Sequence, residues 1–105
     1  MKITIEIDDD IIRRAIGSAK IDYWTSKAEW IDRAGLTLRI VEDDPDPGED
    51  DGEGITLTPM RIAEGVRVLA EKFPHHFADL IAEKGDMYTG DLLIQCACFG
   101  EEKYA

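Results

Sequence analysis

The sequence predicts a single α+β domain, in which helices pack on one face of a mainly antiparallel sheet of three to four strands. Some segments alternate apolar and polar residues, and others space their apolar residues by three and four, which predicts strands and helices respectively. A third observation is the run at residues 92–99, where seven of the eight residues are apolar. A chain of 105 residues is long enough for one hydrophobic core of this kind but not for two.

The alternating segments predict strands at residues 2–7, 21–26, 36–42 and 54–58. In the first and third of these, isoleucine or leucine occupies every second position, which is typical of a half-buried strand. The second keeps a period of two through Ile21, Tyr23 and Thr25, with a helical turn near residues 27–31 as its alternative. Residues 32–35, Asp-Arg-Ala-Gly, are expected to form the turn into the next strand.

The segments with helical spacing are residues 9–19, 59–73, 75–84 and 90–99. Three aspartates precede or open the first helix, where an N-cap and first-turn carboxylates favour the positive end of the helix dipole. Arg13 and Arg14 are expected on its outer side. Thr58-Pro59 is a typical helix start, an N-cap followed by proline at the first helical position.

The run at residues 92–99 is expected to be a helix buried at the centre of the fold, because it is apolar on nearly every side. Thr89 and Asp91 are the candidate N-caps, and Gly100 is the candidate residue at its C-terminal end. A strand is the alternative, since a short apolar run does not reveal its period. The tail at residues 101–105 is expected to leave the surface.

The charge of the chain is unusual, with 23 acidic residues against 12 basic ones and a net charge of −11. Such a polyanion is repelled by nucleic acid and by anionic membranes, so its natural partners are basic protein surfaces. Residues 42–53 contain eight acidic residues, no basic one, two prolines and two glycines. This composition predicts an exposed, flexible loop between two strands.

The acidic loop has three interpretations. The first interpretation is a mimic of DNA, for which the charge density of the loop alone is too low. When extended, its 12 residues span roughly 40 Å, so its eight charges stand about 5 Å apart. Duplex DNA carries about one charge per 1.7 Å of its axis. Other carboxylates, at Asp8–Asp10, Asp86, Asp91, Glu101 and Glu102, would have to help. As a calcium site it fails on spacing, because glycine falls one position too early for an EF-hand. The third interpretation is a loop that only favours solubility.

Metal and catalytic sites have little support in the sequence. His75 and His76 point about 100° apart on a helix, and Cys96-x-Cys98 lacks the spacing of ordinary zinc ligands. The two cysteines are expected to be reduced core residues, in which a buried thiol is inert. There is no nucleophile elbow, glycine-rich phosphate loop or HExxH motif. We therefore expect no enzyme and no cofactor.

Two features resemble small uncharacterised proteins of phages and prophages. One is the pair Tyr23-Trp24 after the first helix, and the other is an apolar helix followed by Gly100, Glu101 and Tyr104. The resemblance implies a mobile-element origin and a place in the cytoplasm of a bacterial host. In size and acidity the chain is similar to anti-CRISPR and other anti-defence inhibitors found among such proteins.

The expected function is non-enzymatic: inhibition of a basic host protein or nucleic-acid-binding complex by an acidic, DNA-mimicking surface. The alternative is a small-molecule-binding or structural phage protein. The protein would be a monomer or homodimer that contacts neither nucleic acid nor membrane directly. The residues expected to bind the partner are Glu42, Asp43, Asp44, Asp46, Glu49, Asp50, Asp51, Glu53, Asp8, Asp9 and Asp10.

Overall fold

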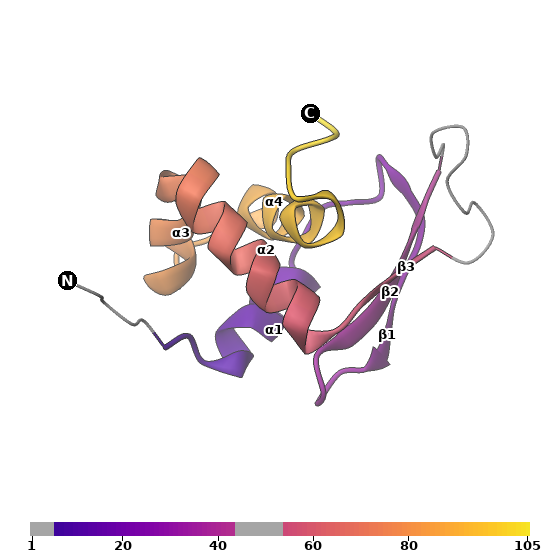
Figure 1. Ribbon diagram of the computed structural model, residues 1–105, viewed down its shortest axis with the longest axis horizontal. Coiled ribbons are helices and arrows are strands. Elements are labelled where there is room, and N and C mark those ends of the chain that lie inside the picture. Colours follow the sequence, from indigo (N-terminus) through magenta and orange to yellow (C-terminus); the bar gives the residue numbers. More distant parts are fainter. Residues whose placement is uncertain (1–5, 44–53) are drawn as a thin grey trace.

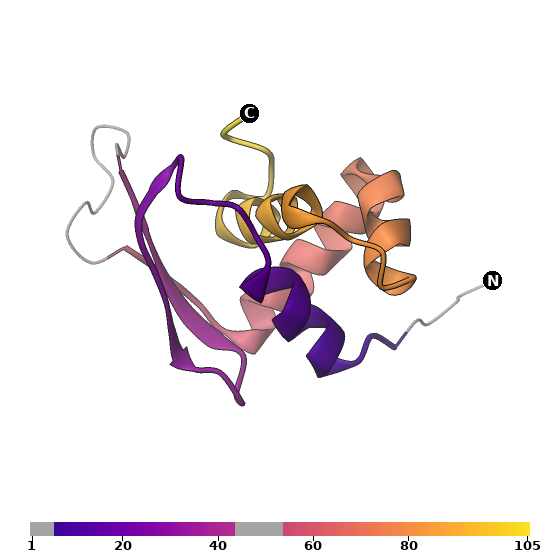
Figure 2. The same cartoon turned by 180° about the vertical axis from the view of Figure 1, so that it is seen from behind.

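The computed structural model describes residues 6–43 and 54–105, and these residues form the predicted α+β fold. The strands β1 (Thr25–Asp32), β2 (Thr37–Glu42) and β3 (Ile55–Leu57) make an antiparallel sheet in the order β1-β2-β3. Figures 1 and 2 show the helices gathered on one side of this sheet. The helices are α1 (Asp9–Gly17), α2 (Pro59–Lys72), α3 (Pro74–Ile81) and α4 (Met87–Phe99).

The sheet confirms two predicted strands and corrects the bounds of a third. β2 and β3 lie where the alternation placed them, and Leu38 pairs with Leu57 across them. Of the strand expected at residues 2–7, only Glu6 and Ile7 lie within the described residues, and neither is in a strand. The other residues of that segment lie outside the described residues.

β1 begins four residues later than expected, and the period of two at residues 21–25 was misleading. The carbonyl of Ile21 accepts the N–H groups of Trp24 and Thr25 at 3.1 and 3.0 Å, and the Thr25 hydroxyl at 2.9 Å. This makes a compact turn that directs the Trp24 ring into the core, where it is 2% exposed. The helical turn considered near residues 27–31 is wrong, because these residues pair with β2.

α4 is the central helix, as its composition predicts. It contacts all three other helices and β3, and every residue from Thr89 to Cys98 is buried. Gly100 ends it in the left-handed conformation, as predicted. Its start differs: Asp86 is the N-cap and accepts the N–H groups of Tyr88 and Thr89 at 3.0 and 3.1 Å. The helix is therefore nearly one turn longer than expected.

Two glycines allow neighbouring helices to approach α4 closely. A Cβ at Gly90 would lie 2.2 Å from the carbonyl oxygen of Ala15 in α1. A Cβ at Gly65 of α2 would lie 2.7 Å from the Cβ of Ala97. Backbone therefore packs directly against backbone or small side chains at both crossings, and this leaves α4 no solvent-facing side along its middle.

Candidate functional site

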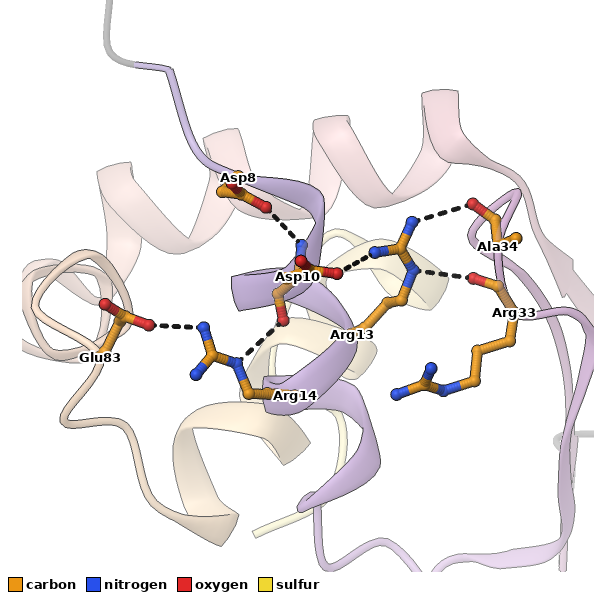
Figure 3. A network of polar contacts seen from close by, with 7 residues as sticks. All are labelled: Asp8, Asp10, Arg13, Arg14, Arg33, Ala34 and Glu83. Carbon is orange, nitrogen blue, oxygen red and sulfur yellow. Dashed lines mark hydrogen bonds and ion pairs between the residues drawn. The ribbon is translucent and has the colours of Figure 1, made fainter.

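The carboxylates at the start of α1 have structural roles, which Figure 3 shows. Asp8 is the N-cap, and its side chain accepts the N–H of Asp10 at 2.8 Å. Asp10 forms an ion pair with Arg13. Asp9 is exposed in the first turn, where a negative charge is favoured by the helix dipole. The capping interpretation is thus confirmed, whereas a part in partner binding stays a prediction.

Arg13 corrects the expectation that both arginines of α1 face outward. Its side chain is only 16% exposed, and its guanidinium donates to the carbonyls of Arg33 and Ala34, each at 3.0 Å. Arg14 does face outward and pairs with Glu83, just after α3, at 2.5 Å. Figure 3 shows these contacts extending from α1 in two directions. They tie the helix to the β1–β2 turn and to the end of α3.

Only the first two residues of the acidic segment, Glu42 and Asp43, lie within the described part of the chain. Asp43 is exposed, and its N–H donates to the carbonyl of Trp24 at 3.0 Å. The chain resumes at β3, where Ile55 pairs with Ile40. Both ends of the segment are therefore fixed to neighbouring strands. The remaining predicted carboxylates lie outside the described residues: Asp44, Asp46, Glu49, Asp50, Asp51 and Glu53.

The two groups of predicted carboxylates are not brought together. Figure 1 shows α1 below the centre of the molecule and β2 ending at the right, so the start of α1 and the end of β2 lie well apart. Asp86 and Asp91, which were also expected to contribute charge, are a helix cap and a buried residue. In the described residues, Asp8–Asp10 and Asp43 therefore lie on separate elements, and their part in partner binding stays a prediction.

The prediction that Glu42 lies in an exposed loop is also wrong, because this residue belongs to β2. Its side chain is 6% exposed, and its carboxylate accepts the Lys103 ammonium at 3.0 Å and the Tyr104 hydroxyl. Burial, followed by the bond to Glu42, raises the pKa of Tyr104 to about 12. Glu42 therefore attaches the C-terminal tail to the sheet, and the tail does not leave the surface as expected.

A second buried carboxylate, Asp91, organises the polar interior of the fold. Its Oδ1 accepts the indole N–H of Trp24 and the amide of Gln95, each at 2.9 Å, and its Oδ2 accepts the Tyr23 hydroxyl at 2.5 Å. Burial, followed by the bond to Asp91 and its charge, raises the pKa of Tyr23. The Tyr23 phenol is therefore held protonated as a donor, and Asp91 is satisfied by three neutral donors.

Gln95 extends this network to the tail. Its Oε1 accepts the backbone N–H groups of Lys103 and Tyr104, each at 2.8 Å, and its Nε2 donates to the Tyr104 carbonyl at 3.0 Å. The Tyr104 ring then stacks on Trp24, with 5.1 Å between the ring centroids. A tail of few residues is therefore held by both a side-chain amide and an aromatic stack.

The sequence analysis missed these two polar residues of α4. Asp91 looked like a helix cap because it stands at the boundary of an apolar run. Its hydrogen-bond partner Trp24 lies 67 positions away, so their contact could not be inferred from the sequence. Gln95 was the one polar residue inside that run. A buried polar side chain needs partners, so its place in an apolar helix was the signal for an internal network.

A cavity of about 500 Å³ opens beside this network, between the segment after α1, helix α4 and the tail. Tyr23, Tyr88, Leu92 and Glu102 contribute to its lining, and so does the buried Asp91. Tyr23 and Tyr88 are 48% and 57% exposed. Large hydrophobic side chains at this exposure, beside buried polar groups, are typical of a binding pocket.

The cysteines and histidines take separate places in the structure. Cys96 and Cys98 are buried and free, and burial raises the pKa of their thiols to about 11 and about 12. Both are therefore thiols at neutral pH and poor nucleophiles. The Nδ1 atom of His76 lies 2.9 Å from the Thr89 hydroxyl. Within residues 6–43 and 54–105, no three His, Cys, Asp or Glu side chains are grouped as metal ligands would be.

Comparisons with protein-family models, curated proteins and solved structures found no match to the chain. In the part of the chain that the structure describes, no helix combines the length and the apolar character that a membrane span requires. Function is therefore argued from the residues and their geometry.

Proposed function

We propose that the protein is a non-enzymatic inhibitor of phage or mobile-element origin that binds a basic host protein through the acidic end of its sheet. The net charge of −11 and the resemblance to anti-CRISPR-like phage proteins in size and acidity support a partner that handles nucleic acid in the bacterial cytoplasm. The same charge disfavours direct contact with nucleic acid or with anionic membranes.

The observation that carries this proposal is the way the acidic segment joins the fold. The strands that flank it, β2 and β3, are adjacent in the sheet, so the two ends of the segment are fixed close to each other. Its base is fixed by the buried Glu42, whose charge is matched by Lys103. From Asp43 to Glu53 the sequence then has no basic residue to match the others. Unmatched charge in one place attracts a basic surface at long range.

The charge density of the segment bears on the kind of recognition that we propose. A duplex carries about one charge per 1.7 Å of axis, whereas a fully extended chain with the sequence of this segment would space its charges by about 5 Å. The carboxylates at the start of α1 lie on a separate element, well apart from the end of β2, and do not raise this density (Figure 1). Charge attraction to a cluster of lysine and arginine side chains is therefore better supported than imitation of a duplex.

The test compares two variants that lose the same number of negative charges. The first neutralises the segment by changing Asp43, Asp44, Asp46, Asp50 and Asp51 to Asn and Glu49 to Gln. The control changes exposed carboxylates elsewhere: Glu6, Glu29, Glu64 and Glu101 to Gln, and Asp22 and Asp79 to Asn. Both variants should stay folded, since exposed substitutions typically change stability by about 0.5 kcal/mol or less each.

The binding experiment is capture from bacterial lysate by the immobilised protein, at low and at physiological salt. A specific partner should be retained by the parent and the control variant, lost by the segment variant, and released as salt rises. Equal loss in both variants would mean that net charge alone causes capture. Unchanged capture by the segment variant would contradict the proposal.

A further inference from the structure

The cavity beside Tyr23 lies at the tail, apart from the acidic segment, and its chemistry can be examined independently of the proposed function. At about 500 Å³ it falls within the range of pockets that hold small organic molecules. Its walls come from the segment after α1, from α3 and α4, and from the tail. Since the tail is held by Gln95 and by the Trp24 stack, the cavity is preformed.

The hydrogen bonds at its wall leave acceptors for a ligand. The Tyr23 hydroxyl donates its one proton to Asp91. The Tyr23 oxygen is then an acceptor for a hydrogen bond from another group, such as a ligand. The Gln95 amide approaches this oxygen at 3.4 Å, which is a long contact. Glu102 adds an exposed carboxylate. A ligand with N–H groups matches these atoms.

Two carboxylates, those of Asp91 and Glu102, line the cavity together with the Tyr23 phenol. Lys20 and His76 also line the cavity. Asp91 lies directly behind the phenol, and within the described residues this carboxylate takes part in no ion pair. After burial and Asp91, the charge of Glu102 also contributes to the raised pKa of Tyr23. The field at the phenol therefore favours a cation.

The exposed rings add a second reason for a cation. Tyr23 and Tyr88 are exposed and line the cavity, and a positive charge within about 6 Å of the face of an aromatic ring is attracted to it. Leu92 supplies an apolar wall against which the body of a ligand can pack. We infer that this cavity binds a small organic amine or guanidine, with its charge near the Tyr23 oxygen and Glu102 and its body against Tyr88 and Leu92.

The test uses 2-phenylethylamine as the probe, with 2-phenylethanol as the neutral analogue of the same shape and phenylacetate as the anion. Binding is followed in the full chain by amide chemical shifts in two-dimensional NMR, at physiological salt. We expect saturable shifts at Tyr23, Tyr88, Asp91 and Glu102 with the amine, and at least about fivefold weaker binding of both analogues, from loss of the charge interactions. Equal binding of the three probes would overturn the inference, as would shifts that never saturate or that lie elsewhere.

Two neighbouring carboxylates provide the matched control. Glu102→Gln removes a cavity charge and should weaken amine binding about two- to fivefold, the range for one partly exposed charge pair. Glu101→Gln removes the same charge beside the cavity, and it should leave the affinity unchanged. Tyr88→Leu keeps an apolar side chain at an exposed site and should also weaken binding about two- to fivefold. Equal effects of the two glutamine variants would show attraction by the net charge alone and would refute the site.

Discussion

The buried carboxylate of Asp91 supports a quantitative prediction about stability. Replacing it by alanine removes the acceptor of three donors, those of Trp24, Gln95 and Tyr23. The Trp24 N–H is left buried without this acceptor, at a cost of about 1–3 kcal/mol. Gln95 keeps its bond to the Tyr104 carbonyl, and Tyr23 is half exposed and can turn to water. With the small void left behind, we expect a loss of about 2–4 kcal/mol.

The isosteric variant Asp91→Asn separates the acceptor from the charge. Its amide oxygen can still accept from Trp24 and Gln95, and its NH₂ group can donate to the Tyr23 oxygen once that hydroxyl turns away. It should therefore lie within about 1 kcal/mol of the parent. Asp79→Ala, at an exposed site of α3, is the matched surface control and should change stability by about 0.5 kcal/mol or less.

Urea unfolding followed by tryptophan fluorescence measures these differences, with thermal melting as a second readout. For a domain of this size, 2–4 kcal/mol corresponds to a fall in Tm of roughly 10–20 °C. A melt of Asp91→Ala within two or three degrees of the parent would refute the assigned role of the carboxylate. If Asp91→Asn were as damaging as Asp91→Ala, the negative charge and not the acceptor would be the stabilising feature.

Three further predictions follow from the packing of α4 and the tail. Leu93→Ala should lower the free energy of unfolding in urea by about 2–5 kcal/mol, whereas Met60→Ala, at an 83% exposed site, should leave it nearly unchanged. Equal effects of the two variants would contradict the central position of α4 in the core. Gly90→Ala should destabilise the fold by about 1–2 kcal/mol, because the added Cβ meets the Ala15 carbonyl. Gly17→Ala has open space around it in α1 and should stabilise the fold by up to about 1 kcal/mol. A change in stability of the same sign for both variants would contradict the close approach of α1 to α4. The pKa of Tyr104 is raised from 10.0 to about 12, so its contribution to stability is fully present below pH 10 and is lost as pH rises through about 12. Tyr104→Phe should reduce the decline in stability between about pH 10 and 12, and an unchanged decline would refute this role.

The sequence predicted those parts of the fold that depend on local chemistry. The helix start at Thr58-Pro59 and the end at Gly100 are set by residues next to each other in the chain, and both are confirmed. The central place of α4 followed from its composition, because a helix apolar on all sides has to be buried. The pairing of β2 with β3 followed from alternation.

The parts that could not be predicted depend on contacts between distant residues. Glu42 looked like the first carboxylate of an acidic loop, and only its contacts with Lys103 and Tyr104, some 60 positions later, show it to be buried. The start of β1 was misplaced for a similar reason. Trp24 lies in the core, where its indole N–H donates to Asp91 and its ring stacks on Tyr104, and both partners are distant in the sequence. Spacing in a sequence carries no information about such partners.

The C-terminal tail connects the two surfaces for which binding is proposed. Lys103 and Tyr104 hold Glu42 at the base of the acidic segment, and the backbone of the same two residues is bound by Gln95, next to Asp91 and Tyr23 at the cavity. The cavity is preformed because Gln95 and the Trp24 stack hold the tail, so a change in the tail disturbs the cavity and the end of β2 together. Coupling between two sites requires a shared element that both of them bias, and within the described residues the tail is an element in contact with both.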